Sequence, residues 1–243
     1  MKLPSTPQAW AIHLSQLVKI FHDAHGLDPF PIKVEALARE YSRQVFPKEP
    51  ITLVDGLELS GGFDGMLMPN PHVPGEWGIV YNKAIRSPGR INFTLAHELG
   101  HYLLHRHISP SGIQCGSREM LDWRSELGAI EAQANTFASF LLMPLDDFRK
   151  QVTSQQVSFD LLGHCANRYG VSLTAAALRW TEIAERRAVL VASRDDHMLW
   201  AKSNTAAFKS GAYFPTRKST IEIPRTSAAH SGNFVNASQT ETV

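Results

Sequence analysis

A His-Glu-x-x-His motif, His97-Glu98-Leu99-Gly100-His101, constrains this chain more than any other feature of its sequence. On an α-helix, residues four positions apart lie one above the other, so both imidazoles can bind the same metal ion. Glu98 lies about 100° further round such a helix, where it can reach a water on that metal and act as a general base. The motif therefore predicts a zinc site on a helix.

The residues around the motif predict that this helix is central and buried. Ser87 and Pro88 are typical of an N-cap and a first helical position, and apolar residues follow on nearly all sides of the segment up to about His107. Gly100 suggests that another backbone approaches closely. Two buried histidines and a glutamate are costly unless they are paired or bound to metal. The alternative is that they are core histidines hydrogen-bonded to backbone.

A catalytic zinc site needs a third protein ligand beside the two histidines. A second predicted helix begins near Glu131 and ends at Pro144, and Glu131 is the carboxylate we select. Asn135 follows one turn later on the same face. Its side chain can hydrogen-bond the far ring nitrogen of a ligating histidine and fix the tautomer of that ring.

Three other residues compete for the third ligand position. His105 lies eight residues after His97, about 12 Å along a continuous helix, and cannot share the metal unless the helix breaks. We expect it to be packed or to lie on the substrate side. Asp122 and Glu126 lie outside the apolar helical pattern but stay open as alternatives.

Two helices and three short strands are predicted before the motif. The helices cover residues 8–25 and 32–41, and β-prone runs cover residues 51–54, 63–68 and 77–82. They suggest a small, largely antiparallel sheet. The third run leads directly into the motif helix, so its edge, with Tyr81 as a possible substrate-side residue, is expected beside the metal, where an extended peptide can add as a strand. The polar segment between His107 and Glu126 is predicted to be a surface loop.

After Pro144 the pattern predicts short helices and then strands. Helical stretches at residues 145–152 and 159–184 enclose a turn near residues 169–172, which is similar to a helix-turn-helix whose second helix carries Arg179. A plain helical hairpin is the alternative. From residue 188 the pattern becomes β-like, with Asp195-Asp196 as a hairpin turn, and continues through residues 212–214 and 221–223.

These patterns divide the chain into four parts, namely a metal-binding core at residues 1–148, helices at 149–186, a small β region at 187–224 and a disordered tail at 225–243. The net charge of +1 and the 43% hydrophobic content exclude a disordered chain and a strongly basic nucleic-acid surface. Two cysteines 50 residues apart favour reduced thiols. Since no apolar run reaches the length of a membrane span or a signal core, a cytoplasmic protein is expected.

Four stretches of the chain resemble the ImmA/IrrE family of metallopeptidases. They are Pro31-Ile-Lys-Val-Glu-Ala-Leu-Ala, Gly61-Gly-Phe-Asp-Gly, the run from Phe93 to His105 that contains the motif, and the helix from Glu131 to Pro144. The resemblance implies an α+β, zincin-like core with a small antiparallel sheet and the HExxH helix, followed by the helix-turn-helix-like helices and the short β region. It also implies zinc ligands His97, His101 and Glu131, with Glu98 catalytic. Gln133 stands where the family commonly has an acidic residue.

The function expected from these features is intracellular zinc-dependent endopeptidase activity, with Mn²⁺ as an alternative to Zn²⁺. The resemblance implies that the substrate is a helix-turn-helix repressor of a mobile element or a stress response. Two other functions stay open. One is a DNA-binding regulator with a non-catalytic metal site, and the other is a protein that sequesters the repressor without cutting it.

Overall fold

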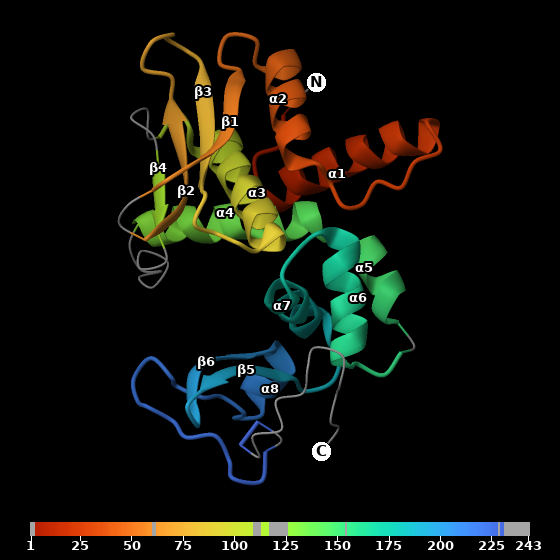
Figure 1. The fold of residues 1–243 in the computed structure, drawn as a ribbon. Helices are drawn as coiled ribbons and strands as arrows, with labels where there is room; N and C mark the ends of the chain where they lie inside the picture. The colour runs from red at the N-terminus through yellow and green to blue at the C-terminus, as the bar shows by residue number, and fades with distance from the viewer. Residues whose placement is uncertain are drawn as a thin grey trace. The chain divides into compact units, whose positions relative to one another are not determined.

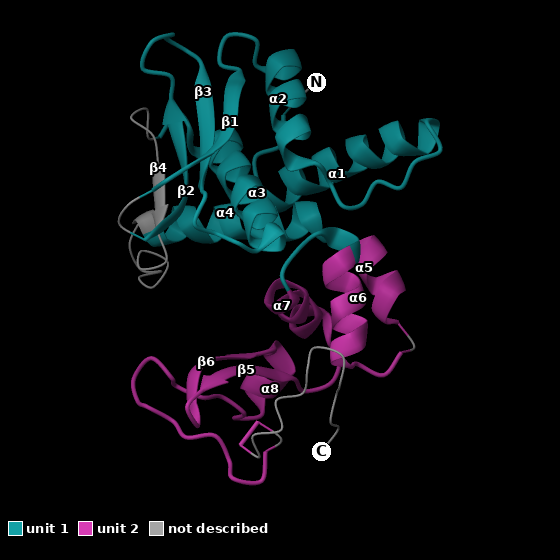
Figure 2. Ribbon diagram, viewed as in Figure 1, with its two compact units in different colours: residues 1–145, 168–172 teal, residues 146–167, 173–243 magenta. Residues whose placement is uncertain are grey.

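The computed structural model describes residues 3–59, 62–108, 113–116, 126–153, 155–227 and 229–230, with the backbone alone at residues 113–116 and 126–127. The chain divides into two compact units (Figure 2). Unit 1 comprises Met1–Leu145 and Arg168–Ser172, and unit 2 comprises Asp146–Asn167 and Leu173–Val243. The four-part division expected from sequence stays a prediction.

The described elements mix helix and strand, as predicted (Figure 1). The helices are α1 (Pro7–Ala24), α2 (Val34–Val45), α3 (Pro88–His105), α4 (Glu126–Leu142), α5 (Leu145–Val152), α6 (Phe159–Tyr169), α7 (Leu173–Ile183) and α8 (Thr205–Lys209). The strands are β1 (Ile51–Leu57), β2 (Phe63–Pro69), β3 (Trp77–Asn82), β4 (Ile113–Gly116), β5 (Val189–Arg194) and β6 (His197–Ser203). The α+β class is confirmed.

The sheet of unit 1 has the strand order β1-β3-β2-β4. β2 pairs antiparallel with both β3 and β4, whereas β1 pairs parallel with β3. The expected exposed edge at β3 is therefore wrong, because β3 is bounded by β1 and β2. Tyr81 belongs to this interior strand, opposite Gly56 on one side and Gly65 on the other. Pairing partners are set by distant parts of the chain, which the local strand pattern does not report.

The segment predicted as a surface loop contains a strand. β4 pairs with β2 and, among the described strands, has no second neighbour, so it is an edge strand of this sheet. Backbone hydrogen bonding to β2 holds this strand, Ile-Gln-Cys-Gly, although it is only four residues long and ends in a glycine, which is depleted in strands. α4 begins at Glu126, earlier than the predicted start at Glu131.

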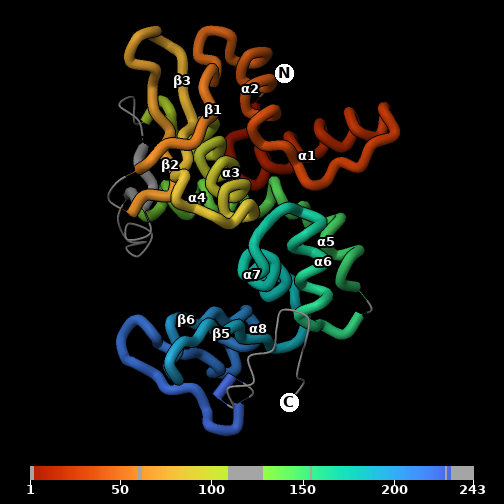
Figure 3. The backbone as a smooth tube through the Cα atoms, in the orientation of Figure 1, coloured from red at the N-terminus to blue at the C-terminus, as the bar shows by residue number. Residues whose placement is uncertain are grey.

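α3 is the central helix of unit 1. Ser87 caps it by accepting a hydrogen bond from the Arg90 backbone N–H at 3.4 Å, and Pro88 opens it. The helix packs against β2 and β3 on one side and against α4 on the other, where the two helices cross (Figures 1 and 3). A Cβ on Gly100 would lie 3.3 Å from the Ala134 Cα, which confirms the close backbone approach predicted there.

The remaining helices of unit 1 complete its core. α1 packs along α4, and α2 packs on β1. Thr6 caps α1 by accepting a hydrogen bond from the Ala9 N–H at 3.2 Å, and Gly26, at φ 68°, lies just past the end of the helix. These contacts bury Trp10, Ala11 and Leu14 of α1 and Val34, Ala38 and Tyr41 of α2, whereas Ile12, Leu17, Ile20 and Phe21 of α1 stay exposed.

Unit 2 carries the predicted hairpin but less strand than expected. β5 and β6 are antiparallel and joined by Asp195 and Asp196, both with positive φ, as a two-residue turn requires. Residues 212–214 form no strand, and residues 221–223 contribute an isolated bridge. Most of the tail predicted to be disordered, residues 231–243, lies outside the described residues. None of the described helices is long and apolar enough to cross a membrane.

Candidate metal centre

Three buried side chains bring their donor atoms to one point between α3 and α4. His97 Nε2 lies 2.9 Å from His101 Nε2, and the two oxygens of Glu131 lie 3.1 Å and 3.2 Å from these nitrogens. The three residues are 6%, 0% and 4% exposed. They form the one cluster of His, Cys, Asp or Glu among the described residues whose donor atoms lie close enough together to hold a metal ion.

The donor set suits zinc. Two imidazole nitrogens and one carboxylate oxygen form a common catalytic zinc set, and bonds of about 2.0–2.1 Å in a tetrahedron separate neighbouring donors by about 3.3 Å. The observed separations of 2.9 to 3.2 Å are close to that edge length. Three ligands leave a fourth position for water or substrate. Manganese also accepts such a nitrogen and oxygen set.

Asn135 lies one turn after Glu131 and contacts the far side of His97. Its Oδ1 is 3.0 Å from His97 Nδ1. An amide oxygen at this position accepts a hydrogen bond from Nδ1–H, which leaves the Nε2 lone pair directed toward the cluster. This is the contact that the spacing of Glu131 and Asn135 suggested.

His105 does not lie on the substrate side. It is 2% exposed, and its Nδ1 lies 3.0 Å from the Nδ1 of His101, behind the donor cluster. Its Nε2 lies 3.3 Å from Gln133 Oε1 on α4. The helix continues through His105 without a break, so the i, i+4 spacing stacks this ring on His101 and keeps it from sharing the metal.

The protonation states of the cluster fit metal binding. Burial lowers the pKa of His101 from its ordinary value of 6.5 to about 4, and burial also lowers the pKa of His105. Burial alone would raise the pKa of Glu131, but hydrogen bonds from His101 and His97 outweigh it and hold that pKa well below 4.5. Near pH 7, His101 is thus neutral and Glu131 is a carboxylate, the forms that bind zinc.

His97 behaves differently from His101 because it lies between two carboxylates. Burial, the largest influence, lowers its pKa, but hydrogen bonding and charge from Glu131 together with the charge of Glu98 hold the pKa above 6.5. A divalent cation bound at this cluster would compete with a proton for His97 Nε2.

Glu98 is fully buried on the side of α3 that faces β2. A Cβ built on Gly65 of β2 would lie 2.8 Å from Glu98 Oε1 and 2.5 Å from Thr94 Cγ2. Any larger residue at position 65 would therefore displace the carboxylate or the strand. Gly65 is the last residue of the Gly61-Gly-Phe-Asp-Gly stretch that carries the family resemblance, but no role at the site was predicted for it.

The other residues that the sequence analysis considered are not part of the donor cluster as the structure describes it. The ring of Tyr81 covers Gly56 of β1, where an added Cβ would lie 2.8 Å from it. Asp122 and the side chain of Glu126 lie outside the described part of the structure. Gln133 was noted in the sequence only as a departure from a family pattern. The contact between His101 and His105 could have been predicted from their four-residue spacing, which places the two rings next to each other on one helix face.

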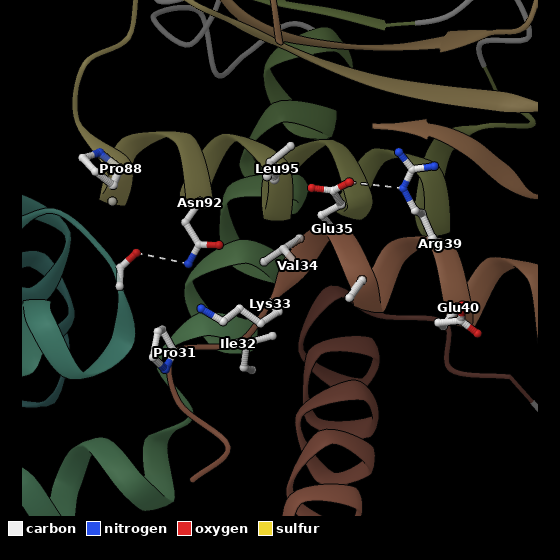
Figure 4. Close-up of a pocket in the computed structure, with 13 residues that line it drawn as sticks. Pro31, Ile32, Lys33, Val34, Glu35, Arg39, Glu40, Pro88, Asn92 and Leu95 are labelled. Carbon is white, nitrogen blue, oxygen red and sulfur yellow. Dashed lines mark hydrogen bonds and ion pairs between the residues drawn. The ribbon is translucent and has the colours of Figure 1, made fainter. Parts of the chain in front are cut away.

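A separate pocket of about 640 Å³ lies between α2 and α3 (Figure 4). Asn92 lines it and donates a hydrogen bond to the Gly170 carbonyl oxygen at 3.1 Å, while Glu35 and Arg39 pair along α2 at 3.3 Å. The residues that line the pocket include no histidine or cysteine. The pocket is distinct from the metal-binding cluster.

The family model of the IrrE N-terminal-like domain, Peptidase_M78, matches residues 62–181, which include the motif helix and α4. Through this domain the chain belongs to the ImmA/IrrE family of metallopeptidases. No curated protein matches the chain. A solved structure, a Mycobacterium tuberculosis transcriptional regulator, is similar with a TM-score of 0.48 and 19% identity over 79% of this chain. The match covers 55% of that regulator, so this chain spans about half of its length.

Proposed function

We propose that this protein is a zinc-dependent endopeptidase that acts in the cytoplasm on one regulatory protein, a helix-turn-helix repressor of a mobile element or a stress response. The observation that carries the proposal is the convergence of His97, His101 and Glu131 on one point, with Glu98 adjacent in the same helix. Membership of a peptidase family supports it. Mn²⁺ is the alternative ion for the same donors.

In this proposal His97, His101 and Glu131 hold the ion, and Glu98 handles protons. Bound zinc would polarise the scissile carbonyl and lower the pKa of water at its open position. Glu98 accepts a proton as the water oxygen bonds to the carbonyl carbon. The same carboxyl then donates that proton to the amide nitrogen as the C–N bond breaks. Asn135 keeps His97 in the tautomer that presents Nε2.

An extended substrate segment would pair with β4 rather than with β3. β4 pairs with β2, the strand whose Gly65 faces Glu98, and β4 has an unpaired side among the described strands. Addition of a strand at such an edge supplies main-chain hydrogen bonds to a peptide independently of its sequence. A repressor segment that becomes extended there would be restrained close to Glu98.

The DNA-binding alternative has less support. Arg179, the basic residue expected on the second helix of the helix-turn-helix-like pair, is 1% exposed and pairs with Glu182 at 3.0 Å. A guanidinium in this position is not available to phosphates. The net charge of +1 also offers little attraction to nucleic acid.

Glu98→Gln separates a peptidase from a sequestering protein. The amide keeps the shape of the side chain but does not accept the proton, so cleavage should fall by about 10²- to 10⁴-fold while metal content stays at the wild-type level. The measurement is mass spectrometry of candidate helix-turn-helix repressors after incubation with zinc-loaded wild type and variant.

Two results would contradict the proposal. Equal cleavage by wild type and Glu98→Gln would exclude Glu98 as the base. Tight repressor binding without cleavage by either protein, at confirmed zinc occupancy, would favour sequestration.

A further inference from the structure

The histidine row on α3 continues one turn beyond the HExxH motif. His97, His101 and His105 follow one another at four-residue spacing, and their ring centroids are 4.6 Å and 5.1 Å apart. The proposed chemistry uses the first two rings and gives no role to the third. A buried imidazole in contact with a proposed ligand constrains the protonation of that ligand.

The contact between His101 and His105 joins two Nδ1 atoms at 3.0 Å. One nitrogen must donate and the other accept, so only one of the two carries a proton. His105 has its second nitrogen 3.3 Å from Gln133 Oε1. The three side chains therefore form a chain of hydrogen bonds in which every proton is set by its neighbour.

This chain has two self-consistent directions. With the Gln133 carbonyl oxygen facing His105, as in the structure, Gln133 accepts from His105 Nε2–H and His105 accepts from His101 Nδ1–H. His101 Nε2 then keeps its lone pair. With the amide of Gln133 reversed, every donor becomes an acceptor and His101 Nε2 carries a proton, which blocks it as a ligand.

We propose that His105 and Gln133 are positioning residues that hold His101 in the tautomer whose Nε2 lone pair faces His97 and Glu131. The inference rests on the proposed function, because it assumes that these three residues bind zinc. Asn135 orients His97 by direct contact. Gln133, on the same helix, orients His101 through one intervening imidazole.

The expected loss of zinc affinity can be estimated from other metal sites in which a hydrogen-bond partner of a ligating histidine has been removed. Loss of such a partner weakens metal binding by about 10- to 100-fold. His105→Phe removes the acceptor and should weaken zinc binding by this amount. Gln133 is exposed, so water can replace part of its contact, and Gln133→Leu should produce a smaller loss in the same direction.

The experiment measures the zinc dissociation constant of the 243-residue chain by competition with a chromogenic chelator. Asn135→Leu serves as the benchmark for loss of a direct partner. His105→Asn keeps an acceptor near the place of Nδ1 and should restore much of the affinity lost in His105→Phe. Gln151→Leu is the matched control, because it removes the same kind of contact, Gln Oε1 to His164 Nε2 at 3.2 Å, outside unit 1.

A second measurement reads the tautomer itself. Ring ¹⁵N chemical shifts of metal-free wild type should place the His101 proton on Nδ1, and Gln133→Leu should increase the population with the proton on Nε2. If His105→Phe does not fold, His105→Asn and these shifts decide the question.

Wild-type zinc affinity in both His105→Phe and Gln133→Leu, or a His101 proton on Nε2 in the wild type, would overturn the inference while leaving the metal site intact. A wild type that binds no zinc would overturn the proposed function and this inference together.

Discussion

Three polar side chains of α4 have defined partners in the histidine row of α3. Glu131 contacts His97 and His101, Asn135 contacts His97, and Gln133 contacts His105. Buried polar groups cost free energy unless they are hydrogen-bonded, so this matching lets a polar cluster occupy the centre of an apolar unit. It also keeps the rings in fixed orientations before any ion binds.

At the residue scale, helical spacing predicted the pairing of His97 with His101 and of Glu131 with Asn135, whereas the choice of Glu131 as third ligand rested on zinc's need for a further ligand and on the family resemblance. Glu131 and Asn135 are four residues apart, as are His97 and His101. The contact of His105 with Gln133 joins two helices at a point set by how they cross. No spacing within one helix reports that crossing, and the role of His105 was left open for this reason.

The buried phenol of Tyr102 should make the free energy of unfolding depend on pH in the alkaline range. Burial raises its pKa well above the ordinary value of 10.0, and its hydroxyl donates to the Glu49 carbonyl oxygen at 2.5 Å. Above pH 10 the unfolded chain therefore loses a proton that the folded chain keeps, so the free energy of unfolding falls as pH rises through this window. Tyr102→Phe should reduce that slope. Urea unfolding between pH 8 and about pH 11 measures it.

The same substitution should cost about 0.5–1.5 kcal/mol at pH 8, where the phenol is neutral in both states, because the hydrogen bond to Glu49 is lost. Tyr213→Phe, at a ring that is 53% exposed, is the control. Identical alkaline slopes in wild type and Tyr102→Phe would contradict the assignment.

At the element scale, helices were predicted more reliably than strand pairing. Ser87 and Pro144 are local signals: α3 begins directly after Ser87, and α4 ends at Leu142, just before Pro144. The interior place of β3 and the strand β4 depend on partners distant in sequence. A pattern of alternating residues identifies a strand but not its neighbours, so the exposed edge of the sheet was assigned to the wrong strand.

Substitution by alanine should have opposite effects on stability at two helical glycines, because only one of them lies in the contact between α3 and α4. A Cβ on Gly100 would lie 2.9 Å from Phe137 Cδ1 and 3.3 Å from the Ala134 Cα, whereas a Cβ on Gly163 of α6 would meet nothing within 4 Å. Gly100→Ala should destabilise the protein, because overpacking costs about 1–3 kcal/mol and exceeds the helix-propensity gain of about 1 kcal/mol.

Gly163→Ala is the matched control, because it should show the propensity gain of up to about 1 kcal/mol without the clash. Urea midpoints at unchanged m-value compare the two variants. A Gly100→Ala protein as stable as Gly163→Ala would mean that Phe137 moves freely, and that α3 and α4 do not need their close approach.

At the scale of the whole molecule, the proposed ligands all belong to one of two compact units. His97, His101 and Glu131 lie in unit 1, as do α3 and α4 that carry them. The β5–β6 hairpin belongs to unit 2. An ion that binds the folded cluster stabilises only those opening reactions that separate its ligands. Bound zinc should therefore suppress local opening in unit 1 and leave local opening of the hairpin in unit 2 unchanged.

Zinc at about 100 times its dissociation constant should stabilise the folded state by about 2.7 kcal/mol. Hydrogen exchange, followed by mass spectrometry with zinc or with excess chelator, should slow in peptides from α3 and α4 and stay unchanged in peptides from β5 and β6. Glu131→Ala should abolish the protection, because it removes the ligand that α4 contributes to the proposed site. His164→Ala, at an exposed histidine of α6, should keep it. Equal protection of the β5–β6 hairpin, or protection that survives in Glu131→Ala, would show that zinc binds elsewhere in the chain.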